Sequence, residues 1–138
     1  MNVKYSDLKN KKVFISGGGS GIGATIVEYF CEQNSDVYFI DINLQESKKL
    51  VAKIKKRKLK TPKFIECDIT DINKLQKTIE DIIKKKGPIN CLINNAANDD
   101  RHTTEQVNEK YWENRMAINL KHYFFAAQSV VKGMKKIK

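Results

Sequence analysis

The stretch KVFISGGGSGIG, residues 12–23, decides the class of fold. Its first five residues form a short run rich in β-branched and aromatic side chains, which predicts a buried strand. Glycines follow directly, and an apolar pattern with helical spacing runs from Ile22 to Gln33. A strand that passes through glycines into a helix points free backbone N–H groups and the positive end of the helix dipole at one place. Phosphate groups bind well there.

The glycine spacing is that of a nucleotide-binding turn. Gly17, Gly21 and Gly23 follow the pattern G-x-x-x-G-x-G, one residue longer in its first gap than the commonest dinucleotide fingerprint. A flexible surface loop is the alternative, but such a loop does not need several glycines between a buried strand and a helix. We predict that the pyrophosphate of a dinucleotide is held by Gly17, Ser20, Gly21, Ile22 and Gly23.

The rest of the chain alternates between the same two kinds of segment. Strands are predicted at residues 12–16, 36–41, 63–67 and 89–94, and helices at 22–33, 44–59, 72–86 and 109–136. The last helix is predicted to carry an apolar side made of Trp112, Met116, Leu120, Tyr123, Phe124, Ala127 and Val131. This alternation predicts one α/β domain over residues 1–138, with a parallel sheet and right-handed crossovers. A chain of 138 residues has room for about four strand–helix units.

An acidic residue, Asp41, closes the second predicted strand. A carboxylate at this place accepts hydrogen bonds from the hydroxyls of an adenosine ribose and repels a 2′-phosphate. Neither Ser20 nor Ile42, predicted to lie beside the ribose, supplies a cation, so the pattern predicts NAD rather than NADP. The alternative for Asp41 is a helix N-cap, although Asn43 can serve instead.

Asp68 ends the third predicted strand and is followed by Ile69. We predict that this pair lies at the adenine, with the carboxylate facing the adenine amino group. The alternative is that Asp68 only starts the next helix, for which Thr70 and Asp71 are already good caps.

The fourth predicted strand ends in two amides and two small residues, Asn94 to Ala97. Small side chains leave space for a ribose and a ring at the carboxyl end of a parallel strand, where open α/β sheets bind ligands. Asn95, Ala96 and Ala97 are therefore predicted on the nicotinamide side of the site.

Asn119 lies inside the last helix among apolar neighbours. An amide without a partner there costs roughly 1–3 kcal/mol. Two explanations stay open: a role in the reaction, or a structural hydrogen bond from the helix to a strand.

No metal site or disulfide is predicted. The acidic residues and the histidine between Asn98 and His102 are nearly consecutive on one loop and have no distant partner, so this loop is expected to contact substrate or only solvent. Cys31, Cys67 and Cys91 are odd in number and lack C-x-x-C spacing, which is typical of small buried side chains.

The charge of +10 comes from 26 Lys and Arg against 16 Asp and Glu. The lysines gather on helix faces and helix ends, and no aromatic residues interleave with them as a stacking platform for bases. We therefore expect solvated faces and no nucleic-acid partner. The sequence also lacks an apolar run long enough for a membrane span or a signal peptide, so a cytoplasmic protein without membrane contact is expected.

Together these residues resemble the short-chain dehydrogenase/reductase family. Ser16, Gly17, Gly21, Ile22 and Gly23 match its T-G-x-x-x-G-I-G turn, with serine for threonine. The run from Asn94 to Ala97 matches its N-N-A-G motif with a final alanine, and Asp41, Asp68 and Asn119 match the NAD-selecting acid, the adenine-contacting acid and the catalytic asparagine that holds a relay water. The region around residues 94–128 is similar to the bacterial branch of sugar dehydrogenases that includes D-xylose 1-dehydrogenase.

The resemblance implies a Rossmann-type doubly wound sheet with strand order 3-2-1-4 and hydride transfer between NAD and a CH–OH group of an aldose or another secondary alcohol. It also implies pairing of family members through the helix of residues 109–136. In the family, catalysis needs a serine and a Tyr-x-x-x-Lys pair after the fourth strand. The one such spacing here runs from Tyr5 to Lys9, ahead of the first predicted strand, and is a coincidence. We expect a truncated dehydrogenase with an incomplete catalytic site; the alternatives are a standalone NAD-binding or interaction module and one half of a split enzyme.

Overall fold

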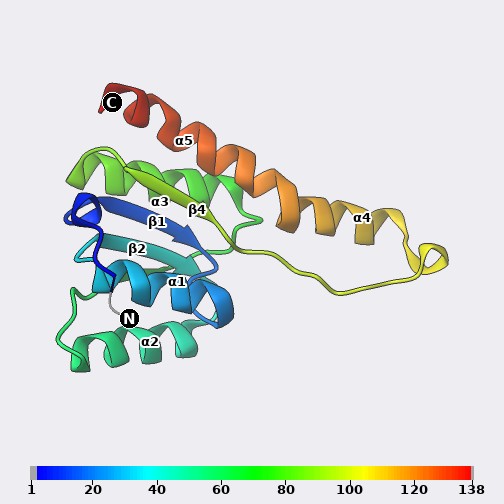
Figure 1. The fold of residues 1–138 in the computed structure, drawn as a ribbon. Helices are drawn as coiled ribbons and strands as arrows, with labels where there is room; N and C mark the ends of the chain where they lie inside the picture. Colours follow the sequence, from blue (N-terminus) through cyan, green and yellow to red (C-terminus); the bar gives the residue numbers. More distant parts are fainter. Residues whose placement is uncertain (1–2, 138) are drawn as a thin grey trace.

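A four-stranded parallel sheet forms the centre of the computed structural model, which describes residues 3–137 (Figure 1). The strand order is β3-β2-β1-β4, which confirms the predicted order. The strands are β1 (Lys12–Ser16), β2 (Asp36–Asp41), β3 (Lys63–Glu66) and β4 (Cys91–Asn94). The helices are α1 (Gly21–Glu32), α2 (Leu44–Lys56), α3 (Ile72–Lys86), α4 (Glu109–Met116) and α5 (His122–Lys136), with short turns η1 (Ser6–Leu8), η2 (Thr104–Gln106) and η3 (Ala117–Lys121).

Helices cover both faces of the sheet. Figure 1 shows α1 and α2 on one face and α3 and α5 on the other. Successive strand residues point to opposite faces, so β1 sends Val13 and Ile15 toward α1 and α2, and Phe14 toward α3 and α5. All three side chains are completely buried. From α3 and α5, the buried members of this cluster are Leu75, Ile79, Ile82, Ala126 and Val130.

The two outer strands are less buried than we predicted. β1 and β2 are almost entirely buried, whereas β3 and β4 are half-buried, and Lys63 and Glu66 of β3 are exposed. Each outer strand has only one neighbour in the sheet, which leaves its other side less covered. Both outer strands and α2 are also shorter than predicted; α2 ends before Lys58, whose φ of 57° is left-handed.

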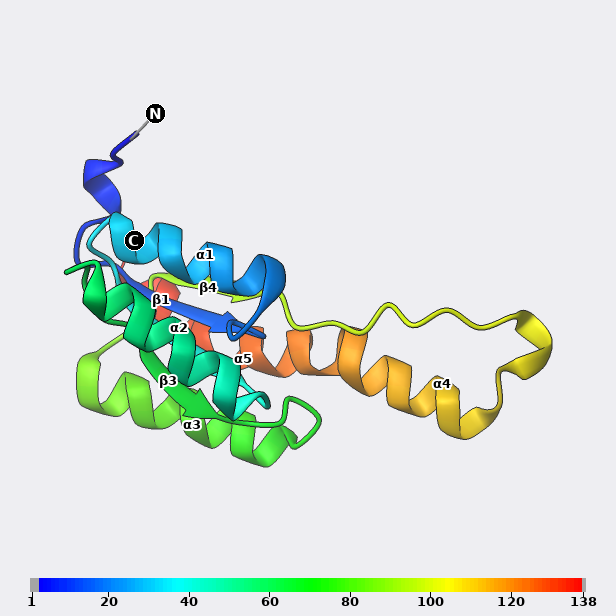
Figure 2. The ribbon, with the colours of Figure 1, turned by 90° about the horizontal axis from the view of Figure 1, so that it is seen from below.

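The last predicted helix follows one continuous path but changes its hydrogen bonding midway. Between α4 and α5 lies η3, a single π-helical turn that contains Asn119. Inserted turns of this kind often occur at functional sites. Figures 1 and 2 show that α4 and the loop before it project beyond the sheet, while α5 packs against α3 and β4.

The predicted apolar side of this helix faces outward. Six of its seven members are exposed, including 58% of Trp112, 55% of Leu120 and 64% of Phe124, and only Tyr123 is half-buried. The buried side of α5 instead consists of His122, Ala126 and Val130. Small residues suit this side because α5 lies close to the segment before β4; a methyl group on Gly133 would be 3.1 Å from Cβ of Pro88.

The cysteines pack as small apolar side chains. Cys31 and Cys67 are buried and Cys91 is half-buried, and all three are free thiols. Burial raises the pKa of each thiol, that of Cys31 to about 12, with Glu28 and Glu32 adding to the effect. A thiol with a raised pKa is a poor nucleophile at neutral pH.

Within residues 3–137, each helix is too short or too polar to cross a membrane.

Candidate functional site

The glycine turn connects β1 to α1 at the carboxyl end of the sheet. The backbone N–H groups of Gly17 and Gly18 both donate to the Ile40 carbonyl oxygen, at 2.8 and 3.1 Å, which fixes the turn against β2. Gly17 and Gly21 have φ values of +67° and +53°, which residues other than glycine rarely adopt. No side chain caps the start of α1, so its first N–H groups remain available to an anion.

Gly23 allows α1 to approach the turn closely. A methyl group there would lie 1.9 Å from the Gly17 carbonyl oxygen and 2.7 Å from Nδ2 of Asn95. The side chain of Ile22, by contrast, is 77% exposed and contributes nothing to the core. The structure therefore brings the predicted pyrophosphate residues together at one helix N-terminus.

Asp41 lies at the end of β2, directly beside this turn. Its Oδ2 accepts a hydrogen bond from Gly19 N–H and its Oδ1 accepts one from Asn43 N–H, both at 2.8 Å. Asn43, not Asp41, caps α2, because its side chain accepts from Glu46 N–H at 3.1 Å. The carboxylate of Asp41 is thus held in position without serving as a helix cap.

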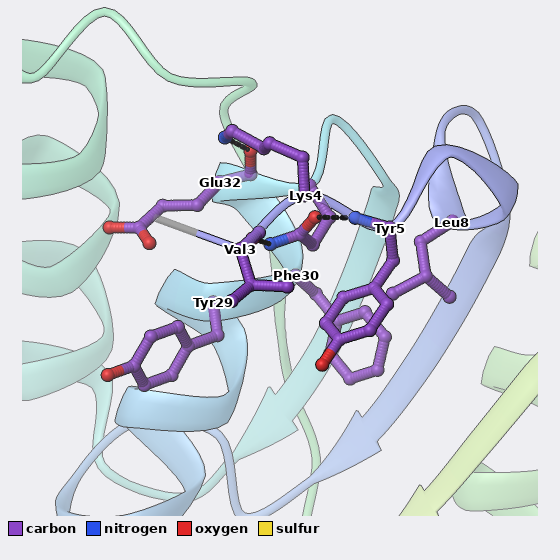
Figure 3. A pocket seen from close by; sticks show the side chains of 8 residues that line it. Val3, Lys4, Tyr5, Leu8, Tyr29, Phe30 and Glu32 are labelled. Atoms are coloured by element: carbon purple, nitrogen blue, oxygen red, sulfur yellow. Dashed lines mark hydrogen bonds between the residues drawn. The ribbon is translucent and has the colours of Figure 1, made fainter. Parts of the chain in front are cut away.

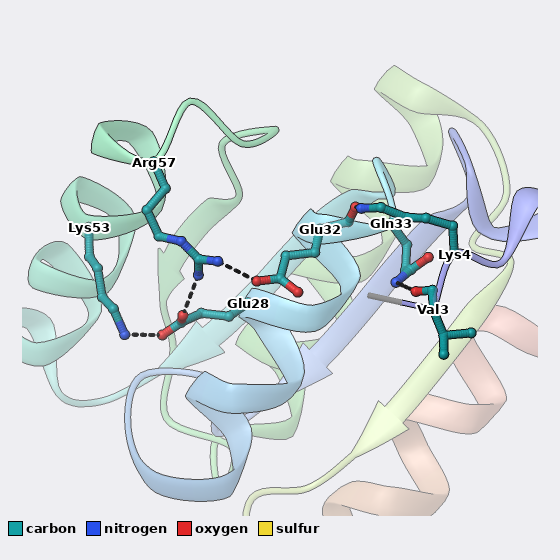
Figure 4. A network of polar contacts seen from close by, with 7 residues as sticks. All are labelled: Val3, Lys4, Glu28, Glu32, Gln33, Lys53 and Arg57. Carbon is teal, nitrogen blue, oxygen red and sulfur yellow. Dashed lines mark hydrogen bonds and ion pairs between the residues drawn. The ribbon is translucent and has the colours of Figure 1, made fainter. Parts of the chain in front are cut away.

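A hollow of about 370 Å³ opens next to the turn, between α1 and α2. The lysines that line it are both paired: Lys49 with Glu46 at 2.7 Å and Lys53 with Glu28 at 2.6 Å. Figure 4 shows Glu28 between Lys53 and Arg57, and Arg57 also reaches Glu32. Both lysines that line this hollow therefore already face a carboxylate.

Asp68 lies beyond the end of β3 and is exposed. Its Oδ1 accepts from both the N–H and the hydroxyl of Thr70, at 2.8 and 2.7 Å. Asp71 caps α3 by accepting from Lys74 N–H at 2.9 Å, so Asp68 is not the cap. Ile69 is half-buried and packs against the core.

The predicted residues after β4 tie this strand to the glycine turn. Asn95 Nδ2 donates to the carbonyl oxygens of Ser16 and Gly17, at 3.1 and 2.9 Å. The Ser16 hydroxyl accepts from the N–H groups of Asn95 and Ala96, both at 3.1 Å. Ser16 was predicted only as part of the motif, yet its hydroxyl connects the two halves of the site. Ala97, the next residue, is exposed.

Asn119 makes two hydrogen bonds to the loop after β4. Its Oδ1 accepts from Asn98 N–H at 2.8 Å and its Nδ2 donates to the Asn98 carbonyl oxygen at 2.9 Å. Tyr123 adds a third bond, from its hydroxyl to the Ala96 carbonyl oxygen at 3.1 Å. Asn119 therefore makes structural hydrogen bonds, as one of its two explanations predicted, but they reach a loop and not a strand. Tyr123 was missed because we expected it on an apolar side.

The loop of residues 98–103 is also held by α4. Arg115 pairs with Asp100 at 3.0 Å and lies over the Tyr111 ring, 4.8 Å from its centre. The Tyr111 hydroxyl donates to the Asp100 carbonyl oxygen at 3.0 Å. Among residues 3–137, no group of three His, Cys, Asp or Glu side chains is placed to hold a metal ion.

His122 follows η3 and is completely buried. Neither ring nitrogen has a hydrogen-bond partner among the described residues. Burial lowers the pKa of His122, and the nearby carbonyls of Ile118 and Ala117 offset this only in part. The imidazole is therefore neutral in the folded protein at neutral pH.

This burial predicts a pH-dependent stability. An unfolded histidine titrates near 6.5, above the lowered folded pKa, so the unfolded state binds more protons as the pH falls below 6.5. The free energy of unfolding should decrease by up to about 1.4 kcal/mol per pH unit in that window. Urea unfolding at pH 7.5 and 5.5 measures it. The decrease should shrink in His122→Leu and persist in His102→Asn, where the histidine is exposed; equal slopes in all three proteins would contradict the assignment.

Tyr5 and Lys9 lie at the other end of the sheet. They flank η1, which precedes β1, whereas the glycine turn follows β1. Tyr5 lines a shallow hollow of about 320 Å³ with Leu8, Tyr29 and Phe30 (Figure 3). This placement separates the chance Tyr-x-x-x-Lys spacing from the site.

Comparison with known proteins gives a consistent result. The family model for short chain dehydrogenase matches residues 11–138. A probable galactose dehydrogenase from Rhizobium meliloti is 36% identical over 133 residues, and D-xylose 1-dehydrogenase from Caulobacter vibrioides is 39% identical over 132 residues. Each alignment covers 96% of this chain but only 52% and 51% of the relative, so the chain spans about half the length of these proteins.

A solved structure agrees with both. Thermoplasma acidophilum aldohexose dehydrogenase superposes with a TM-score of 0.81 at 27% identity, over 96% of this chain and 47% of that one. The glycine turn, the strand order and these matches have one explanation: the chain belongs to the short-chain dehydrogenase family.

Proposed function

We propose that this chain binds NAD and forms the cofactor-binding part of an NAD-dependent sugar dehydrogenase. The observation that carries the proposal is the Asp41 carboxylate, fixed at the end of β2 by the N–H groups of Gly19 and Asn43. Each of its oxygens retains a free lone pair, so the carboxylate can accept from the ribose 2′-hydroxyl. The lysines of the adjoining hollow are paired with glutamates, which supports NAD over NADP.

The residues present fit this cofactor. The pyrophosphate would lie at Gly17, Ser20, Gly21 and Gly23, where a side chain at Gly23 would close the approach. Asp41 and Ile42 would hold the adenosine ribose, Asp68 and Ile69 the adenine, and Asn95 to Ala97 the nicotinamide side. Bound NAD would supply the hydride acceptor, while the protein binds and orients it.

Asn119 is proposed to act in the proton relay. Its Oδ1 accepts one hydrogen bond from Asn98 N–H and retains a second lone pair, which can hold a water molecule. The two bonds to Asn98 fix the amide in orientation, which such a role requires.

The proposed substrate class is an aldose or another secondary alcohol. The sugar dehydrogenases at 36% and 39% identity support this class. Catalysis by the family also needs a Tyr-x-x-x-Lys pair after the fourth strand, and residues 95–138 do not contain this spacing. We therefore propose that residues 1–138 bind the cofactor and do not complete the reaction alone.

Two measurements on the 138-residue chain test this function. Calorimetric titration should show that NAD binds more tightly than NADP. Incubation with NAD and D-xylose or D-galactose should give no NADH absorbance. Tighter NADP binding would refute the cofactor assignment. Turnover that disappears in Asn119→Ala would show that the catalytic site is complete. NAD binding that no added sugar or second polypeptide converts into turnover would favour a standalone binding module.

We further propose that two copies pair through residues 109–136. The supporting observation is the outward apolar row of this helix, which contains Trp112, Leu120 and Phe124. Sedimentation velocity should show a dimer or a larger assembly for the unmodified chain and a monomer for Leu120→Glu/Phe124→Glu. Lys121→Glu, an exposed change between these positions, should still associate. A monomeric unmodified chain would refute the pairing.

A further inference from the structure

Ser47, in the first turn of α2, has a hydroxyl without a hydrogen-bond partner among residues 3–137. The residue is completely buried. A buried polar group left unpaired costs about 1–3 kcal/mol. Such a group is rare in folded proteins, and its position here next to the proposed ribose site suggests a use.

The Ser47 hydroxyl and the Asp41 carboxylate face the same point of the glycine turn. A methyl group on Gly19 would lie 2.4 Å from Ser47 Oγ and 2.9 Å from Oδ2 of Asp41. Because Gly19 has no side chain, the Ser47 hydroxyl and the Asp41 carboxylate can both lie against its backbone. The hydroxyl has an O–H that is not used in a hydrogen bond, and the carboxylate oxygens accept hydrogen bonds.

The carboxylate has room for another donor. Two of its lone pairs are already used by the N–H groups of Gly19 and Asn43. An ionised carboxylate has about four acceptor positions, so the two that remain can take one hydrogen bond from a ribose hydroxyl and one from Ser47.

We propose that Ser47 is a specificity-determining residue for the adenosine end of the cofactor: its hydroxyl donates to Asp41 when the carboxylate binds the ribose. This inference rests on the proposed NAD site. A third protein donor fixes the direction in which the carboxylate points. A fixed charge binds the 2′-hydroxyl and repels a 2′-phosphate, so the hydroxyl of Ser47 strengthens the preference for NAD.

The test is calorimetric titration of the 138-residue chain with NAD and with NADP at pH 7.5. In Ser47→Ala, NAD binding should weaken about three- to tenfold, while NADP binding stays within about twofold. Urea unfolding of Ser47→Ala without cofactor should show no loss of stability, since the removed hydroxyl is unpaired in that state.

Ser129→Ala is the matched control, because its hydroxyl donates within α5 to the Phe125 carbonyl, outside the site. It should leave both titrations unchanged. Equal weakening of NAD and NADP binding in Ser47→Ala, or unchanged NAD binding, would overturn the role of Ser47 and leave the proposed NAD site standing. Failure of the folded, unmodified chain to bind NAD would overturn the proposed function and this inference with it.

Discussion

Replacement of Asp41 by alanine should weaken NAD binding by about 10- to 100-fold, while NADP binding changes by no more than about threefold. The variant loses the hydrogen bond from a ribose hydroxyl, and a bond to a charged group contributes about 1.5–3 kcal/mol. It also leaves the Gly19 and Asn43 N–H groups without their acceptor, so the turn is held less firmly. NADP escapes most of this loss, because the variant no longer repels its 2′-phosphate.

Titration of both cofactors into both proteins measures the effect. Asp36→Ala is the matched control: it removes the same side chain from the same strand at the opposite end, where Asp36 pairs with Lys60. This variant should bind NAD like the unmodified chain. If Asp41→Ala and Asp36→Ala have equal affinities for NAD, the carboxylate at the end of β2 does not select the cofactor.

Replacement of Gly23 by alanine should lower the free energy of unfolding by about 3 kcal/mol and abolish nucleotide binding. The added methyl group would lie 1.9 Å from the Gly17 carbonyl oxygen, and backbone has to move to relieve this contact. Overpacking typically costs 1–3 kcal/mol, and here it also displaces Asn95, which donates to the same oxygen. Small domains are stable by about 5–15 kcal/mol, so the loss is a large part of the total.

Urea unfolding compares Gly23→Ala with Gly21→Ala. Gly21 has a φ of +53°, but a methyl group there meets nothing within 4 Å. Gly21→Ala should therefore cost only the backbone strain, about 1–2 kcal/mol. A smaller loss for Gly23→Ala than for Gly21→Ala would mean that close packing at Gly23 is not what the turn requires.

The sequence predicted the inner strands and the turn well, because their patterns have one physical solution. β1, β2 and α3 have the predicted bounds. The continuous apolar runs of β1 and β2 fit only strands buried on both faces. Asn43 and Asp71 cap α2 and α3 as their positions suggested, which left Asp41 and Asp68 free of that task.

The last helix was harder, because α5 carries apolar residues on more than one side. Periodicity gives the spacing of a helix but not which of two rows packs inward. We chose the row with the larger side chains, including Phe124, whereas the sheet accepts the row with Ala126 and Val130. The π-helical turn has no sequence signal of its own, and Tyr123 and Ser16 act through hydrogen bonds that pattern analysis does not detect.

The strand order has a consequence for the sequence of folding events. β1 pairs with β2 after one short crossover, but its pairing with β4 joins distant residues, such as Lys12 and Asn90, which are 78 positions apart. Contacts between distant positions need more loop closure and form more slowly. During synthesis, the glycine turn and Asp41 should therefore meet before Asn95 arrives, so the chain should assemble the proposed adenosine end of its site first and the proposed nicotinamide end last.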